Sequence, residues 1–319
     1  MAPLPVERTS EGAPFEDTGL DLMGPFGTIM NGRAVHKVWF AIFTCFRTRS
    51  VHAEMVYKLD ASSLINAIVR FNARRPGVRR FISDRGTNLT AAEKILKNEL
   101  SEWNQQVARH LQTRGLEWSF IPANTPHYGG VWERVVGLFK RHLKTLSVGE
   151  ALHVDVLNTS VVEIESIVNR RPLTALSSDA ADYEAITPAH ILNPAVISHS
   201  SAIIVETVGD THAEKLKCLW RRAQSRVNAF WKAWRRDYLT LLHDRQKWTK
   251  TKKDMQVGDL MLIVDESTRR GEWHLARVTR TEGTPSHARK AWLKRADGKE
   301  VLRDRSKLVH LELEKNDNE

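Results

Sequence analysis

An apolar run that ends in a single aspartate and a glycine turn constrains the fold of this chain most. Val78, Phe81 and Ile82 predict a short buried strand, and Gly86 permits a sharp backbone reversal that a Cβ atom would oppose. Because a helical pattern follows, Asp84 is predicted to lie at the carboxyl end of a sheet, where α/β folds usually place their chemistry. An ordinary polar turn is the alternative interpretation, and the other acids of the chain bear on the choice.

Three segments before this strand predict an antiparallel meander. Residues 20–23 are a short apolar segment that contains Asp21 and is closed by a Gly-Pro pair, residues 37–44 are almost all apolar, and residues 50–57 alternate as a half-exposed strand does. Burial of an unpaired carboxylate costs several kcal/mol, so Asp21 needs a cation, hydrogen-bond donors or water beside it.

Helices are predicted around these strands. Apolar residues recur at helical spacing in residues 60–71, 91–111, 131–146 and 152–169. Residues 116–121 predict one more short strand, and residues 122–130, with two prolines and two glycines, predict a mobile loop. Glu133 falls in the first turn of the helix after that loop. The helix dipole favours a glutamate there whatever its function, so a capping role is the alternative for this residue.

The positive charge of the chain lies in its last third. The net charge is +10, and residues 1–210 carry 22 Lys and Arg against 22 Asp and Glu, whereas residues 211–319 carry 26 against 16. Residues 211–248 predict one long basic amphipathic helix, and the short strands that follow predict a small antiparallel barrel. This asymmetry favours a polyanionic partner such as nucleic acid, with a solvated basic surface as the alternative.

Cysteine usage and hydropathy narrow the class of protein further. Cys45 and Cys218 are the two cysteines, which excludes a disulfide framework and a zinc site built from several cysteines. No apolar run is long enough for a membrane span, and the first residues lack the apolar core of a signal peptide. We therefore expect a soluble intracellular protein.

Three acids stand out by their predicted positions: Asp21 within the first strand, Asp84 at the exit of the fourth, and Glu133 behind the predicted loop. If the first and fourth strands are neighbours in a mixed sheet, the two aspartates meet at one edge and the helix can bring the glutamate over them. Clustered carboxylates repel one another, so they favour divalent cations between them. Magnesium suits such a site, and two ions can activate an attacking oxygen and stabilise a leaving one.

The motifs around these acids resemble those of retroviral-type integrases, most closely the integrases of Pao/BEL long-terminal-repeat retrotransposons. The matching segments are Asp21 with its flanking Gly19 and Gly24-Pro25, IFTCFRTR at 42–49 followed by His52, SDRGTN at 83–88, PHYGGVWER at 126–134, NRRPLT at 169–174 and TPAH at 187–190. The later segments 220–222, 230–236, 238–239 and 258–260 also resemble the end of such integrases. The departures are Arg85, where the family usually has Asn, and Leu89, where it usually has Phe.

This resemblance implies an RNase H-like mixed five-stranded sheet flanked by helices, followed by a long linker helix and an SH3-like barrel. It implies a catalytic and metal-binding triad of Asp21, Asp84 and Glu133 that holds two Mg²⁺ or Mn²⁺ ions, and no small-molecule cofactor. The expected activity is 3′-end processing and strand transfer on DNA by a homo-oligomer that acts in the nucleus, with no membrane partner. The expected DNA contacts are Asn124, His127, Tyr128, Gly129, Lys140, Lys144, Arg222, Arg226, Arg235, Trp273, Arg277 and Lys294.

The predicted domains follow from the same resemblance. They are an irregular lead-in (1–14), a catalytic core (15–195), a connecting segment with the long basic helix (196–250), the C-terminal barrel (251–312) and a tail (313–319). The His/Cys zinc module of full-length integrases has no counterpart in the sequence, so we expect a fragment, a processed product or a gene remnant.

Two other functions stay open. An RNase H-type nuclease would share the fold, although that family uses a further acid on the helix after the third strand, where this chain offers Asp60 alone. A non-catalytic nucleic-acid-binding or assembly protein derived from an integrase is the other alternative.

Overall fold

The computed structural model describes residues 11–30, 35–83, 91–92, 94, 117–120, 136–147, 151–175, 183, 185–193, 219–242, 255–265, 268–284 and 287–311 of the chain. The chain divides into two compact units. The first comprises Met1–Val168 and Thr207–Phe230, and the second comprises Asn169–Glu206 and Trp231–Glu319. Each unit has its own sheet, and the domain boundaries predicted from the sequence stay predictions.

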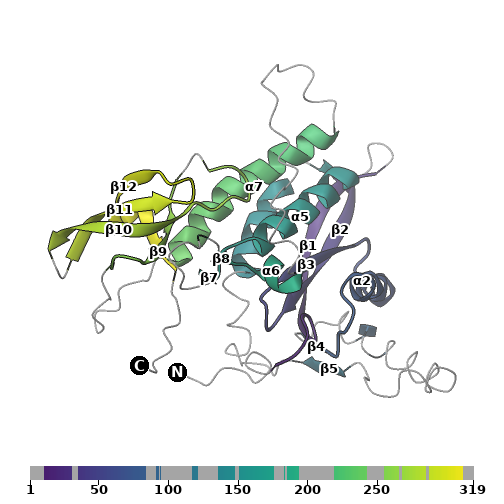
Figure 1. The fold of residues 1–319 in the computed structure, drawn as a ribbon. Coiled ribbons are helices and arrows are strands. Elements are labelled where there is room, and N and C mark those ends of the chain that lie inside the picture. Colours follow the sequence, from purple (N-terminus) through teal and green to yellow (C-terminus); the bar gives the residue numbers. More distant parts are fainter. Residues whose placement is uncertain are drawn as a thin grey trace, which may run out of the picture. The chain divides into compact units, whose positions relative to one another are not determined.

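The first unit is built on a mixed sheet with the strand order β3-β2-β1-β4-β5 (Figure 1). The strands are β1 (Asp17–Ile29), β2 (Val35–Cys45), β3 (Val51–Val56), β4 (Arg80–Ser83) and β5 (Glu117–Phe120). β1 pairs antiparallel with β2, and β2 with β3, whereas β1, β4 and β5 run parallel. A sixth, two-residue strand, β6 (Leu152–His153), pairs with the far end of β1. The predicted meander and the mixed sheet are therefore confirmed. The prediction of a half-exposed third strand is wrong, because β3 is buried along its whole length.

The first strand is longer than its sequence predicts. Gly24 and Pro25 do not close β1; the strand continues to Ile29, and the register of β1 on β2 shifts between Met23 and Phe26. Gly24 has φ +145°, and a Cβ atom there would lie 2.6 Å from the Trp39 ring. The Gly-Pro pair thus makes a bulge in the strand instead of ending it.

Two helices of the first unit are fixed to the sheet in different ways. α2 (Ala61–Arg74) starts after Asp60, whose carboxylate accepts a hydrogen bond from the Ser63 backbone N–H at 2.7 Å. Phe71 of α2 stacks on Phe43 of β2 with ring centroids 3.9 Å apart. α5 (Val154–Asn169) instead reaches the edge strand β3, because Glu165 accepts a hydrogen bond from the Ala53 backbone N–H at 3.0 Å.

A further helix of this unit covers residues 136–144 and ends in the short 3-10 helix η1 (Thr145–Ser147). Its apolar side chains are buried and its basic ones are exposed or half-buried, as the predicted amphipathic stripe requires. Phe139 packs edge-on against Phe230 of α7 (Leu219–Leu242), with ring centroids 6.5 Å apart.

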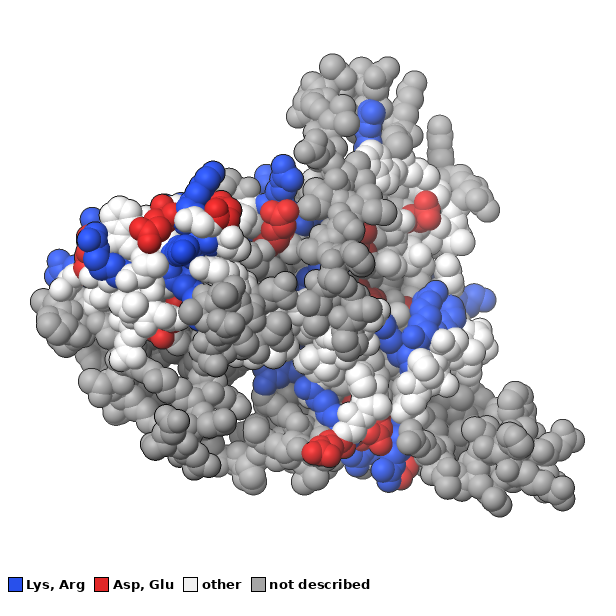
Figure 2. Space-filling view, viewed as in Figure 1, with Lys and Arg blue, Asp and Glu red and all other residues white. Residues whose placement is uncertain are grey.

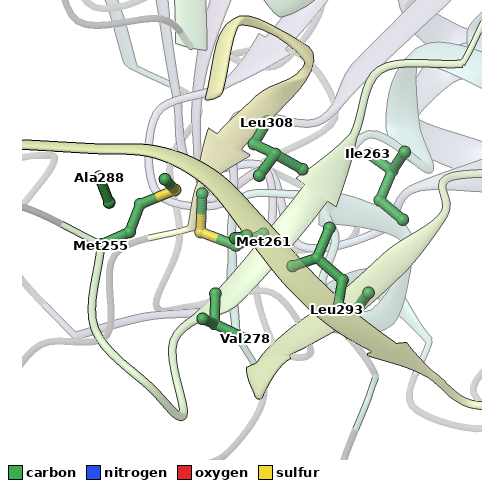
Figure 3. Packing of buried hydrophobic residues seen from close by; sticks show 9 residues of the cluster. Met255, Met261, Ile263, Val278, Ala288, Leu293 and Leu308 are labelled. Atoms are coloured by element: carbon green, nitrogen blue, oxygen red, sulfur yellow. The ribbon is translucent and has the colours of Figure 1, made fainter. Parts of the chain in front are cut away.

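The second unit contains an antiparallel sheet with the order β12-β11-β10-β9-β13. Its elements are β9 (Leu260–Ile263), β10 (Leu275–Thr284), β11 (His287–Arg295), β12 (Glu300–Asp304), η3 (Arg305–Lys307) and β13 (Leu308–His310). Figure 3 shows the side chains of Met255, Met261, Val278, Leu293 and Leu308 gathered in one cluster between these strands. Burial of this cluster supplies the hydrophobic stabilisation of the sheet.

The remaining elements of the second unit are β7 (Thr174–Ala175), which pairs with β8 (Ala185–Ile186), and the short helix α6 (Pro188–Leu192). α7 is the long helix predicted between residues 211 and 248; the parts of that prediction outside 219–242 lie beyond the described residues. Its residues up to Phe230 belong to the first unit, and those from Trp231 onward belong to the second. Among the described helices, none is long and apolar enough to cross a membrane.

Candidate functional site

Asp21 lies in β1, the strand with neighbours on both sides in the centre of the first sheet. On one side it faces Ile42 of β2 across the antiparallel pairing. On the other side, the parallel pairing of β1 with β4 sets Leu20 opposite Ser83. Leu20 is followed in sequence by Asp21, and Ser83 by Asp84. β4 ends at Ser83, as the apolar run in the sequence predicts.

The end of β4 is held firmly in the sheet. Ser83 is fully buried, and its hydroxyl oxygen accepts a hydrogen bond from the Trp118 indole N–H of β5 at 2.9 Å. Phe81, two residues earlier, packs against the same indole with ring centroids 5.5 Å apart. The backbone that leads to position 84 therefore starts from a fixed point.

Lys140 meets Asp21 from the helix of residues 136–144. Its ammonium group forms a hydrogen-bonded ion pair with the Asp21 carboxylate. Burial lowers the pKa of Lys140 to about 8, and the charge of Lys144, one turn further along the helix, adds to this effect. The ammonium form still prevails at pH 7, so the two charges are paired.

The structure describes one of the three acids of the predicted triad. Asp21 is described, whereas Asp84 and Glu133 lie outside the described ranges. Within those ranges, no three His, Cys, Asp or Glu side chains form a group that could hold a metal ion.

The predicted DNA contacts of the first unit fall into two groups. Asn124, His127, Tyr128 and Gly129 lie outside the described residues. Among the described ones, Lys144 is exposed, Lys140 pairs with Asp21, and Arg222 and Arg226 are half-buried on α7.

In the second unit, Trp273 and Arg235 lie beside the aromatic residues of α7. Trp273 packs edge-on against Trp231 and Tyr238, with ring centroids 5.2 and 5.6 Å away. The Arg235 guanidinium lies 5.8 Å from the centre of the Trp231 ring and donates a hydrogen bond to the Thr268 carbonyl at 3.3 Å. Both side chains thus contribute to the packing of this unit.

Arg277 and Lys294 are opposite partners in the β10–β11 ladder, but their exposure differs. Arg277 is buried and donates a hydrogen bond to the Gly258 carbonyl at 3.0 Å. Lys294 is exposed. Of this pair, Lys294 has the accessible charge that a phosphate contact requires.

Trp292 lies on the same face of β11 as Lys294 and is not among the contacts predicted from the sequence. The Arg280 guanidinium lies 5.3 Å from the centre of the Trp292 ring, and the Trp292 indole N–H donates to Glu282 at 2.8 Å. Strand alternation from Lys290 to Lys294 is the sequence signal that places Trp292 with the two lysines. Figure 2 shows that acidic side chains are interspersed with the basic ones over these strands.

A buried polar cluster links β3 to α5 and α2. The two ring nitrogens of His52 each lie 3.0 Å from a carboxylate, Nδ1 from Glu165 and Nε2 from Glu54. Arg70 and Arg74 of α2 also pair with Glu54. Burial alone would lower the pKa of His52, but the hydrogen bonds and charges of Glu165 and Glu54 outweigh it and raise that pKa. Every member has a partner, so this cluster is structural.

One family model matches the chain. It is DUF5641, a family of unknown function, which matches residues 218–311. No curated protein matches the sequence.

Solved structures that are similar to the chain include a viral intasome and the catalytic core domains of viral integrases. A chain of the simian T-cell lymphotropic virus intasome in complex with PP2A regulatory subunit B56 gamma is 12% identical, with 95% of this chain and 81% of that chain covered and a TM-score of 0.36. The HTLV-2 integrase catalytic core domain in complex with magnesium is 14% identical (57% and 98% covered, TM-score 0.35). The catalytic core domain of BIV integrase is 16% identical (58% and 97% covered, TM-score 0.35). Scores of this size do not establish a common fold, so the fold rests on the strand order and register.

Proposed function

We propose that this chain is a DNA integrase of retroviral type whose active site is formed by Asp21, Asp84 and Glu133. The observation that carries the proposal is the parallel register of β1 and β4, in which Leu20 faces Ser83 and each is followed by an aspartate. The strand order β3-β2-β1-β4-β5, with the first three strands antiparallel and the last three parallel, supports an RNase H-like sheet.

Covalent geometry supports the meeting of the two aspartates. Consecutive Cα atoms lie about 3.8 Å apart. Ser83 is paired with Leu20, the residue before Asp21, so the chain distance from this pair to each aspartate is one residue. Glu133 precedes the helix of residues 136–144 by three positions, and Lys140 of that helix pairs with Asp21. The helix that would carry the glutamate therefore already reaches the first aspartate.

The residues of this site fit divalent cations. The Asp21 side chain is 43% exposed and already faces a cation, the ammonium group of Lys140. Asp21, Asp84 and Glu133 would hold two Mg²⁺ or Mn²⁺ ions, because these ions take a few carboxylates and complete their shell with water and phosphate oxygens. When bound, two such ions activate an attacking oxygen and stabilise the leaving one in an in-line displacement.

The proposed reaction has two steps at phosphorus. In the first step, water attacks a phosphodiester near the 3′ end of the element DNA, and a short terminal piece leaves with the 5′-phosphate. In the second step, the freed 3′-hydroxyl attacks a phosphodiester of the target DNA and displaces a 3′-hydroxyl there, so the number of phosphodiester bonds is unchanged. Asp21, Asp84 and Glu133 would orient these oxygens for the in-line attack.

The proposal also covers the source of the chain, the role of its second unit, its self-association and its location in the cell. The motif set favours a Pao/BEL-type retrotransposon as the source, and the antiparallel sheet of β9 to β13 would be an SH3-like domain that contacts DNA phosphates. The HTLV-2 integrase core is known in dimeric and trimeric forms, which supports self-association of this chain as well. Joining to chromosomal DNA would take place in the nucleus.

Incubation of the full chain with Mg²⁺ or Mn²⁺ and a branched DNA that mimics the strand-transfer product tests this proposal. An integrase joins or resolves the branch and leaves an RNA–DNA hybrid intact. Cleavage of the hybrid RNA alone would establish the nuclease instead, and salt-sensitive DNA binding without turnover would establish a non-catalytic assembly protein.

A further inference from the structure

The ion pair between Lys140 and Asp21 has a consequence for metal binding, which rests on the function proposed above. The Lys140 side chain is 22% exposed and comes from a helix, whereas the Asp21 carboxylate comes from the central strand of the sheet. Lys140 therefore joins the helix to the strand through this ion pair. Arg141, the next residue, is exposed. Among the described residues, it is the cation found on Asp21.

An ammonium group and a divalent cation cannot both occupy this carboxylate favourably. The carboxylate has lone pairs for both, but the two positive charges would lie a few Å apart in a partly buried site, where Coulomb repulsion is only weakly screened. Lys144, one turn along, adds a third positive charge near the same place. A cation that binds Asp21 must therefore displace Lys140, or it binds more weakly because the ammonium group repels it.

We propose that Lys140 is the counter-ion of Asp21 in the metal-free protein and competes with the divalent cation for that carboxylate. In this role Lys140 neutralises the Asp21 carboxylate before a metal ion binds. Displacement by the metal ion frees the ammonium group for an anion, so metal loading and phosphate binding are coupled through one side chain.

Mn²⁺ titration of the full chain without DNA tests this competition, with calorimetry and the electron paramagnetic resonance signal of free Mn²⁺ as readouts. We expect Lys140→Gln to bind Mn²⁺ at least about threefold more tightly than the unaltered chain, the scale of a partly exposed ion pair. Arg141→Gln removes a charge from the same helix without touching Asp21 and controls for long-range electrostatics, so its affinity should change less than twofold, about the limit of the measurement.

Lys140→Arg separates loss of the positive charge from a structural effect of substitution at position 140. It keeps the charge, so it should bind Mn²⁺ no more tightly than the unaltered chain. Equal or weaker binding by Lys140→Gln, with the fold intact by circular dichroism, would overturn the competition while leaving the proposed function in place. The proposed function itself fails if Asp21→Asn binds Mn²⁺ as well as the unaltered chain, because the measured site is then elsewhere.

Discussion

Leu20 of β1 lies opposite Ser83 of β4 in a parallel pairing, and an aspartate follows each of them in the sequence. The buried hydroxyl of Ser83 accepts a hydrogen bond from the Trp118 indole N–H. The Asp21 carboxylate forms an ion pair with Lys140. The residues that follow this pair in the sequence are therefore both acids, although 63 positions separate Leu20 from Ser83. This relationship between local strands is the physical basis of the proposed active site.

The His52 cluster predicts a pH dependence of stability. The pKa of His52 is raised above 6.5 in the folded chain, so the stabilisation it provides is complete below pH 6.5 and is lost as the pH rises through the raised value. The pKa of Glu54 is lowered below 4.5, so its contribution is present above pH 4.5 and is lost as the pH falls. Stability from this cluster should therefore be highest between these two values.

Urea unfolding of the full chain from about pH 5.5 to about pH 8.5 measures this effect. His52→Gln should cost about 1–3 kcal/mol at the acidic end and remove most of the decline on the alkaline side. His36→Gln, an exposed histidine of the neighbouring strand, should keep the normal profile. The same alkaline decline in His52→Gln would assign the pH dependence to other groups.

Tyr238→Phe should destabilise the second unit. The Tyr238 hydroxyl donates a hydrogen bond to the Pro172 carbonyl at 2.7 Å, in a buried site beside Arg171, and burial raises the pKa of Tyr238 to about 12. Loss of the hydroxyl leaves that carbonyl without its donor, which costs about 1–3 kcal/mol in the free energy of unfolding. Tyr57→Phe, at a side chain that is 52% exposed, should change stability by less than about 0.5 kcal/mol. Equal effects in the two variants would show that the Pro172 hydrogen bond contributes nothing.

Lys294→Ala and Arg277→Ala should separate DNA binding from stability. Lys294 is exposed, so its removal should reduce the slope of log K against log salt by about 0.9 without changing the melting temperature. Arg277 is buried on the Gly258 carbonyl, so its removal should cost about 1–3 kcal/mol of stability. Lys58→Ala, exposed in the first unit, provides the reference for loss of one charge. An unchanged salt slope in Lys294→Ala would remove this strand from the DNA-binding surface.

The sequence predicted those features that depend on neighbours in the chain. The apolar run in residues 37–44 predicts β2 correctly, and the apolar spacing in residues 60–71 predicts α2 correctly, because apolar runs and side-chain periodicity are local properties. The prediction that the strand ends at Gly24-Pro25 is wrong. A bulge and a turn use the same residue types, and only the pairing with the neighbouring strand distinguishes them.

The contacts within the candidate site could not be predicted from the sequence, because they join residues that are distant in the chain. The sequence indicated Asp21 and Lys140, but their ion pair joins a strand and a helix that are distant in the sequence, and no spacing rule gives it. The sequence alone does not show that Arg277 is buried on the Gly258 carbonyl or that Trp273 packs against Trp231. Tertiary partners decide the role of such side chains.

We infer that Asp84 acts with Asp21 in catalysis, and the joining rate of the Asp84→Asn variant on a branched DNA substrate measures this role. Loss of one ligand should lower the rate at least about 100-fold in Mg²⁺ and Mn²⁺, since even outer-shell changes at metal sites cost about 10–100-fold. Asp60→Asn is the matched control, because asparagine caps a helix as well as aspartate does, and it should react at the normal rate. If Asp84→Asn reacts as fast as Asp60→Asn, Asp84 is not a catalytic residue.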